Sequence, residues 1–394
     1  MEAKVKKRTK SSSPTKMQNS KLKFKIKNPY FLVVIFSISF LAIPLVSQSA
    51  TLYLQPQAQT VYQGDSFVIE IRINTEGEEI NVLEVSLTFP SDLLEIVDFN
   101  KGNSILTLWP KEPQTQRGKI NFLGGTPEGF NGDGLITKII FLGKEIGQAK
   151  VSFKEDSKVL LNDGMGTPAK VSLSEVNYEI IKKTEGLPVI SSQSHPDQNK
   201  WYKSNTLSIH WEPRQGVQYN YLLSKDLLAE PEEVPNQLIG DVEYKNLEDG
   251  IYYFILKQKL PVESWSAKIS FRAMIDKTPP EPFQPKIGKD PSLFEGKYFL
   301  GFFTTDKSSG IDYYEIKEGK NNFKREISPY LLLDQKLQSK ILVKVVDRAG
   351  NEQIAEITPQ PKPFPYWIII LIFGGAGIVF WLIRKLKFKY QKTK

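Results

Sequence analysis

From residue 51 onward, apolar and polar residues alternate along the chain. Every second residue of the segment 67–73 is Phe or Ile, and every second residue of 83–89 is Leu, Val or Phe. Clusters of Gly, Asp, Asn and Pro separate such segments. Alternation with a period of two predicts strands that bury one face and expose the other. Many short strands with regular turns predict an all-β fold built from β-sandwiches.

Two breaks divide this β-rich part into three predicted modules. One break lies at 182–188, where Lys, Gly and Pro end a strand pattern. The other lies at 276–282, where three prolines cannot donate ladder hydrogen bonds. We therefore expect tandem β-sandwiches at 51–181, 187–275 and 277–358. The second and third share an aromatic strand followed by a Tyr-rich strand, which indicates divergent copies of one sandwich type.

Two uncharged apolar runs bracket the three modules. Residues 29–46 follow a basic leader, 1–28, and residues 366–383 precede a basic tail, 384–394. A helix of about 20 apolar residues can cross a bilayer, and cationic flanks stay in the cytoplasm. The sequence therefore predicts a plasma-membrane protein that is single-pass after signal cleavage, with residues 51–365 on the extracellular side.

The two apolar runs have different predicted fates. Small residues, Ser49 and Ala50, follow the first run, so residues 29–50 are predicted to be a secretory signal peptide, with an uncleaved signal anchor as the alternative. Residues 366–383 are predicted to be a transmembrane helix. The Pro-rich segment 359–365 is predicted to be a stiff spacer that lifts the modules off the membrane.

The distribution of charge excludes some functions. The formal net charge is +8, but the basic flanks carry the excess, and the chain between them is acidic. This argues against nucleic-acid binding and favours contact of the flanks with anionic lipid. Because the chain has no Cys and only two His, zinc and thiol chemistry are not expected. We expect no cofactor and no metal site.

Residues 51–181 resemble the cohesin domain. The likeness is carried by the order and spacing of several segments, and no single segment is specific. These segments are 61–67 with its Gly-Asp turn, 82–96, 132–141 and the closing loop 162–168. The resemblance implies a cohesin-like jelly-roll sandwich that binds a protein partner, a dockerin-like domain or another surface protein. It also implies a setting that often involves polysaccharide degradation.

The second and third modules resemble, more loosely, fibronectin type III and bacterial immunoglobulin-like repeats. The junction 276–280 and the segment 346–351 carry this likeness. It implies two immunoglobulin-like sandwiches that act as a stalk, which is a statement about architecture and not about activity.

Two places on the first module are predicted to contact a partner. One is the solvent face of the strand 82–89, which carries Glu84, Ser86 and Thr88. The other is the apolar segment 106–109, with Leu106 and Trp109, because exposed aromatic residues anchor interfaces. The alternative for Trp109 is that it caps the edge of the sandwich.

A carbohydrate-binding surface adhesin is the alternative function. In it, Tyr221, Tyr253 and Tyr314 would stack on sugar rings. Alternation requires that about half of the tyrosines of the second and third modules point into the core. The remaining tyrosines define this alternative.

The sequence offers little to a catalytic function, and we expect no catalytic residue and no enzyme. It has no Gly-x-Ser-x-Gly motif. His195 lies near Asp197, but the segment is predicted to be a loop that tucks Trp201 or Tyr202 into the second core. The acidic segment 230–233 is predicted to be a solvated loop rather than the carboxylate pair of a glycosidase.

Two Gly- and Asp-containing segments are predicted to be turns. A calcium loop starting at Asn131 would need a Glu where Leu142 stands. We therefore expect a hairpin turn at 131–134 and a turn at 162–164.

Overall fold

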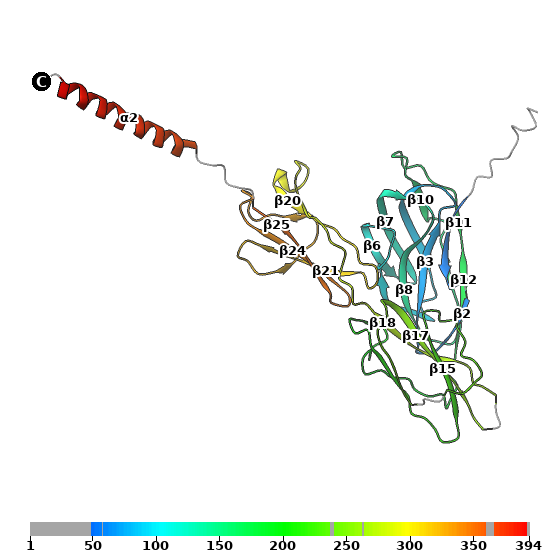
Figure 1. Cartoon of the computed structure of the whole chain (residues 1–394). Helices are drawn as coiled ribbons and strands as arrows, with labels where there is room; N and C mark the ends of the chain where they lie inside the picture. The colour runs from blue at the N-terminus through cyan, green and yellow to red at the C-terminus, as the bar shows by residue number, and fades with distance from the viewer. Residues whose placement is uncertain (1–48, 57, 237–239, 262–263, 360–365, 392–394) are drawn as a thin grey trace, which may run out of the picture. The chain divides into compact units, whose positions relative to one another are not determined.

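The computed structural model describes residues 49–391 except 57, 237–239, 262–263 and 360–365 (Figure 1). In these ranges the chain is all-β, with tandem sandwiches followed by one apolar helix. This confirms the predicted fold class. The predicted leader, nearly all of the signal segment and most of the spacer lie outside the described residues. Residues 48–394 group as one unit by their contacts, and the limits of each module stay a prediction.

The first sandwich packs two sheets face to face. Sheet A has the strand order β11-β1-β3-β8-β5, and sheet B has the order β2-β12-β9-β4-β7-β6, with β10 also paired to β4. The strands are β1 (Ala50–Gln55), β2 (Ala58–Tyr62), β3 (Ser66–Asn74), β4 (Ile80–Thr88), β5 (Leu94–Asn100), β6 (Leu108–Gln116), β7 (Lys119–Phe130), β8 (Asp133–Gly143), β9 (Gly147–Phe153), β10 (Lys158–Leu161), β11 (Val171–Leu173) and β12 (Glu175–Ile181).

The core of the first sandwich lies between these sheets. The alternating apolar side chains of β3, from Phe67 to Ile73, face those of β4, from Leu83 to Leu87, and all of them are buried. Burial of each such side chain stabilises the fold by about 1.5–3 kcal/mol. The period-two pattern therefore predicted the buried face of both strands correctly.

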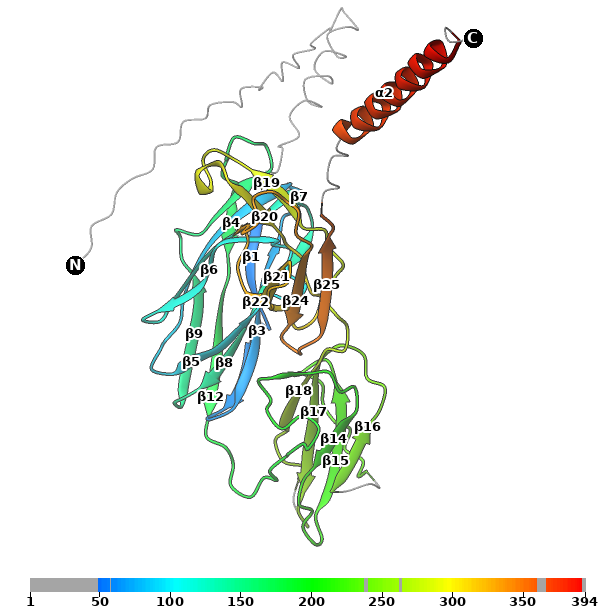
Figure 2. The ribbon, with the colours of Figure 1, turned by 90° about the vertical axis from the view of Figure 1, so that its left-hand side faces the viewer.

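The second sandwich, green in Figure 2, has a four-stranded sheet of order β13-β18-β17-β15 and a two-stranded sheet of β14 and β16. Trp211 lies at its centre, fully buried, with its ring 5.6 Å from Phe254 and 5.9 Å from Tyr219. The strands are β13 (Trp201–Tyr202), β14 (Leu207–His210), β15 (Gln218–Ser224), β16 (Asp241–Tyr244), β17 (Gly250–Lys259) and β18 (Ile269–Ile275).

The third sandwich has sheets of order β19-β20-β23 and β22-β21-β24-β25. Leu300, Ile316 and Val343 are buried between them. A bulge interrupts the pairing of β21 with β24 between Ile311 and Tyr313. The elements are β19 (Lys286–Lys289), the 3-10 turn η1 (Phe294–Gly296), β20 (Tyr298–Gly301), β21 (Ile311–Glu318), β22 (Lys324–Arg325), β23 (Tyr330–Leu331), β24 (Ile341–Asp347) and β25 (Glu352–Ile357).

The helix α2 spans Tyr366–Gln391 and carries the second apolar run. Its segment Tyr366–Lys385 has a mean hydropathy of 2.3, and none of it is buried against the protein. By length and composition this segment is sufficient to cross a membrane.

Candidate functional site

Glu84, Ser86 and Thr88 lie on the outer face of β4, opposite the buried face, but their surroundings differ. Glu84 is exposed, and its carboxylate lies 3.2 Å from Lys158 Nζ on the paired strand β10. Thr88 is half-buried, and its hydroxyl lies 3.1 Å from the hydroxyl of Ser152 on β9. Of the three predicted contact residues, Glu84 is the one whose side chain a partner can reach.

Ser86 is buried, and its predicted place on a solvent face is therefore wrong. Its hydroxyl donates to Asn121 Oδ1 on β7 at 2.8 Å. Ser157, in the turn between β9 and β10, binds both the backbone N–H and the carbonyl of Ser86 through its Oγ, at 3.1 Å each. This turn covers the middle of β4, so Ser86 joins neighbouring segments and is not available to a partner.

The predicted exposed segment 106–109 is also partly buried. Leu106 belongs to the core of the first sandwich, and a Cβ at Gly124 would lie 2.5 Å from its Cδ1. Gly124, on β7, thus leaves space for the side chain of Leu106. Because Leu106 is buried, it cannot contact a partner. Trp109 is half-buried on the edge strand β6, with its ring 5.7 Å from Phe122. The edge-capping alternative describes this position.

A groove of about 970 Å³ adjoins this edge. Leu108 and Trp109 line it from the first sandwich, and Phe303 and Tyr313 line it from the third. Leu108 and Phe303 are nearly half exposed. The apolar part of the segment 106–109 that reaches solvent is therefore Leu108, which the sequence did not single out.

The second sandwich covers part of the outer face of sheet A. Val68 on β3 and Ile140 on β8 form one buried cluster with Trp201 and Met274. Both faces of this part of sheet A are therefore packed, one on the first core and one on the second sandwich. This arrangement explains why β8 reads as a nearly continuous apolar run, as strands buried on both faces do.

Sheet B instead presents a polar outer face along β9, β4 and β7. Lys150, Glu84 and Lys119 are exposed there, one on each of these strands. Lys150 pairs with Glu175 of β12 at 2.6 Å. Surface ion pairs of this kind contribute little to stability, so these charges can exchange partners at small cost. A rigid sheet with alternating charges is suited to recognise a complementary surface.

The three tyrosines of the sugar-binding alternative are buried or half-buried. Tyr253 is buried on the side of β17 that faces the first sandwich, and burial raises its pKa. Tyr221 is half-buried, with its ring 5.4 Å from Trp211. Tyr314 packs 5.0 Å from Phe302. Burial contradicts sugar stacking by Tyr253, whereas for half-buried Tyr221 and Tyr314 it stays a prediction.

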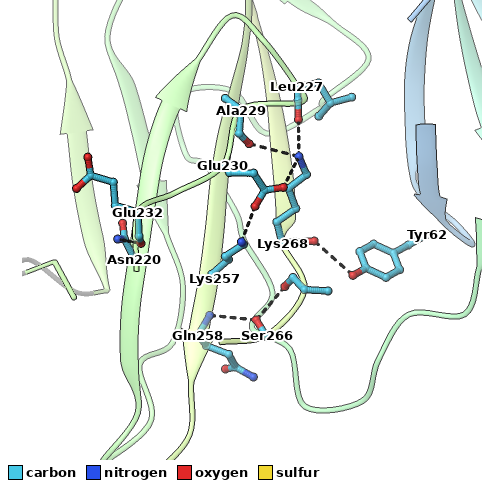
Figure 3. Close-up of polar contacts among 11 residues, drawn as sticks. Tyr62, Asn220, Leu227, Ala229, Glu230, Glu232, Lys257, Gln258, Ser266 and Lys268 are labelled. Atoms are coloured by element: carbon cyan, nitrogen blue, oxygen red, sulfur yellow. Dashed lines mark hydrogen bonds and ion pairs between the residues drawn. The ribbon is translucent and has the colours of Figure 1, made fainter. Parts of the chain in front are cut away.

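The acidic loop that contains Glu230 is exposed to solvent, and polar contacts tie it to the neighbouring sheet (Figure 3). Glu230 forms ion pairs with Lys257 at 2.5 Å and Lys268 at 3.0 Å. These two lysines, through the hydrogen bond from Lys257 first, lower the pKa of Glu230. Asn220 on β15 donates to the carbonyls of Glu232 and Val234. Glu230, Glu232 and Glu233 are exposed, which agrees with the predicted solvated loop, although two lysines and an amide also hold the loop against the sheet.

His195 and Asp197 do not form a catalytic pair. His195 is buried, with Nδ1 2.8 Å from Ser194 Oγ and its ring 4.8 Å from that of Tyr202. The carboxylate of Asp197 instead accepts from the backbone N–H of Asn199 at 2.8 Å. Trp201 is buried, but it packs with Val68 and Ile140 of the first sandwich and not in the second core, where the sequence analysis placed it.

The segment 131–134 is a turn, but it is not a hairpin. It joins β7 of sheet B to β8 of sheet A, which are not neighbours in either sheet. Asp133 binds Arg72 at 2.6 Å and accepts from the hydroxyl of Tyr53. The chain crosses from one sheet to the other here, which turn residues alone do not reveal.

Sequence analysis missed a cluster of three buried carboxylates, Asp276, Asp306 and Asp347. Each lies at or just beyond the end of a strand, in the segments Asp-Lys-Thr-Pro, Thr-Asp-Lys-Ser-Ser-Gly and Val-Asp-Arg-Ala-Gly-Asn. An Asp at the end of an apolar strand in three loops was the available signal. The sequence did not show that the three loops meet.

No protein-family model matches the chain, and no curated protein matches its sequence. Among solved structures, the chain is similar to a non-cellulosomal cohesin from the hyperthermophilic archaeon Archaeoglobus fulgidus, at 18% identity over 35% of this chain and 95% of that one, with a TM-score of 0.30.

Two other solved structures are similar at lower identity. The third ScaB cohesin of R. flavefaciens, in complex with a group 1 dockerin, is 9% identical over 36% of this chain and 100% of its own, with a TM-score of 0.28. The fibronectin(III)-like modules of Clostridium thermocellum CbhA are 11% identical over 57% and 93%, with a TM-score of 0.18. At these identities and TM-scores the likenesses carry no argument about function.

Proposed function

We propose that the chain is a membrane-anchored surface protein, without catalytic activity, whose first sandwich binds a protein partner through the outer face of sheet B. The observation that carries this proposal is that part of the outer face of sheet A is buried, where Val68 and Ile140 pack on the second sandwich. Sheet B keeps the exposed charges Glu84, Lys119 and Lys150. The partner class, a dockerin-like domain, follows from the sequence resemblance of residues 51–181 to cohesins.

The C-terminal helix supports the anchoring part of the proposal. The segment Tyr366–Lys385 is long and apolar enough to span a bilayer, and Lys and Arg follow it in the sequence. The positive-inside rule then places the tail in the cytoplasm and the three sandwiches outside. Protease added to intact cells should remove the sandwiches and spare the tail; sandwiches that stay intact would contradict this topology.

The binding part is tested with the full-length chain in detergent, immobilised, and dockerin domains produced from the genome of the same organism. We expect at least one dockerin domain to bind, and Glu84→Lys to weaken it by about tenfold or more, because a reversed charge meets complementary charge on the partner. Glu243→Lys is the matched control, because Glu243 is also an exposed strand residue paired with a lysine, Lys245, at 2.9 Å.

Two results would contradict the proposal. One is that none of the dockerin domains binds the wild-type chain. The other is that Glu84→Lys and Glu243→Lys bind as tightly as the wild type while Leu108→Asp loses binding, which would move the site to the groove beside β6.

A further inference from the structure

Three carboxylates from separate loops meet where the second and third sandwiches join. Asp276 follows β18, Asp306 lies in the loop after β20, and Asp347 ends β24. One carboxylate oxygen of each lies within 4.8 Å of one of each of the others. The exposed fractions of the three residues are 0%, 5% and 1%. The cluster is therefore removed from water as well as crowded.

No positively charged side chain neutralises this cluster among the residues that the structure describes. Of the basic residues next to the three carboxylates along the chain, Lys307 binds Glu281 at 2.6 Å, Arg348 binds Asp98, and Lys277 is exposed. Backbone N–H groups and the side-chain amide of Asn351 donate to these carboxylates. Three buried negative charges without a cation are costly.

The amide donors leave one oxygen of Asp306 uncommitted. Its Oδ1 accepts from the backbone N–H groups of Ser308 and Gly310, at 3.0 and 2.8 Å. No hydrogen bond to its Oδ2 occurs among the described residues. The loop thus fixes the carboxylate by one oxygen and leaves the other without a hydrogen bond from the described residues.

The electrostatics of the cluster agree with this geometry. Burial is the largest cause that raises the pKa of each of the three groups, and it brings the pKa of Asp276 to about 6. Charge repulsion within the cluster raises the three pKa values further. Asp306 raises the pKa of Asp276, Asp347 raises that of Asp306, and Asp276 raises that of Asp347. The protein alone does not make this arrangement favourable for three ionised carboxylates.

The hydroxyl of Ser309 is a second, independent observation that points to a ligand. Ser309 is fully buried, and its Oγ has no hydrogen-bond partner among the described residues. The hydroxyl nevertheless lies close enough to the Asp276 carboxylate to lower the pKa of that group. The backbone N–H of the same residue donates to Asp276 Oδ2 at 3.0 Å. A buried hydroxyl without a partner is rare unless a ligand completes it.

We propose that Asp276, Asp306, Asp347 and Ser309 bind one calcium ion. All four offer oxygen, the ligand type that hard divalent cations take, and neither His nor Cys takes part. Calcium accepts six to eight oxygen ligands in flexible geometry, whereas magnesium demands near-ideal octahedral geometry and keeps several waters. Loops from three places in the chain with neutral and anionic oxygens therefore suit calcium.

The ion would join all three sandwiches. The loop with Asp306 and Ser309 also contacts the first sandwich, where Asn100 Nδ2 donates to the Ser309 carbonyl at 2.6 Å and Asn103 N–H to the Asp306 carbonyl at 3.1 Å. The backbone N–H of Asp276 donates to the carbonyl of Tyr202 in the second sandwich at 2.9 Å. Calcium would stabilise the fold at this junction by binding the native state alone.

The test uses the full-length chain in detergent, stripped with EDTA and returned to chelator-free buffer. Calorimetric titration with CaCl2 should give one site per chain, and millimolar CaCl2 should raise the thermal midpoint by about 5 °C or more. Equimolar MgCl2 should raise it less. Asp306→Asn should abolish both calcium effects, because it replaces the uncommitted oxygen by an amide and keeps Oδ1 for the two backbone donors. Asp312→Asn, an exposed residue nearby, is the control and should respond as the wild type does.

The Asp306→Asn variant also distinguishes loss of a calcium ligand from damage to the fold. Without calcium, Asp306→Asn should unfold at a temperature equal to or above that of the stripped wild type, since one of three repelling charges is removed. The proposal is overturned if calcium leaves the wild type unchanged, if magnesium acts as strongly as calcium, or if Asp306→Asn keeps the calcium response. Failure of dockerin binding would not affect this result.

Discussion

Arg272 of the second sandwich holds Ser66 of the first by two hydrogen bonds, from Nη1 to the Ser66 carbonyl at 3.1 Å and from Nη2 to its hydroxyl at 2.9 Å. Arg272 is 2% exposed, although it is the most polar side chain on β18. Its Nε donates to the carbonyl of Gln198 at 2.9 Å as well. The donors of this side chain therefore join the second sandwich to β3 of sheet A.

Arg272→Met should lower the free energy of unfolding by about 2–3 kcal/mol, because half-buried Ser66 and the carbonyl of Gln198 lose the hydrogen bonds of a buried charged donor. The change is measured by denaturant unfolding of the full-length chain. Lys245→Met, at an exposed position just after β16 of the same sandwich, should change the free energy of unfolding by less than about 0.5 kcal/mol. Equal effects of the two changes would mean that the Arg272 contacts are not formed.

Leu106→Ala and Leu108→Ala should lower the free energy of unfolding by different amounts, although the two residues are only two positions apart. Leu106 is buried in the first core and Leu108 is nearly half exposed. The first change should cost about 2–5 kcal/mol of unfolding free energy, and the second below about 1 kcal/mol. Chemical denaturation of both variants side by side provides the measurement. A larger loss at Leu108 would show that the register of this segment is wrong.

Gly102→Ala should disturb the contact between the first and third sandwiches. A Cβ at this position would lie 2.1 Å from the carbonyl oxygen of Ser308, which is backbone and cannot rotate away. We expect a loss of about 1–3 kcal/mol. Gly301→Ala is the control, because its nearest atom would be 3.8 Å away. If both alanine variants unfold at the wild-type denaturant midpoint, the close approach does not exist in solution.

The two histidines should titrate on opposite sides of the ordinary value of about 6.5. Burial lowers the pKa of His195, and a hydrogen bond to Asp241 raises the pKa of exposed His210. The contribution of His195 to stability is therefore lost as pH falls from its unfolded pKa toward its lower folded pKa. The contribution of His210 is present at low pH and is lost as pH rises through its folded pKa. NMR of the imidazole signals, assigned with His210→Gln, checks this; reversed order would contradict the structure.

Alternation along the sequence was sufficient to predict which side of β3 and β4 faces the core. It could not show what covers the opposite side. Ser86 is buried because a turn from a distant strand lies over it, and Tyr253 is buried because another sandwich does. Both depend on long-range packing, which a local pattern does not contain.

Local irregularity alters the face of the strand on which Tyr314 lies. Regular alternation from Ile311 places Tyr313 inside and Tyr314 outside. The bulge between Ile311 and Tyr313 shifts the register by one residue, and such a shift exchanges the two faces of a strand. Tyr314 therefore enters the core, while the guanidinium of Arg325 lies 3.6 Å above the ring of Tyr313.

The hydrogen bonds from Asn100 and Asn103 to the Asp306–Ser309 loop have a mechanical consequence. In a chain held at its C-terminal end, a partner that pulls on the first sandwich transmits tension along two parallel routes. One route follows the covalent backbone through the second sandwich. The other route passes directly from the first sandwich to the third through these hydrogen bonds. The two routes would thus share the pulling force. The hydrogen bonds of Asn100 and Asn103 would have to break before the first and third sandwiches could separate.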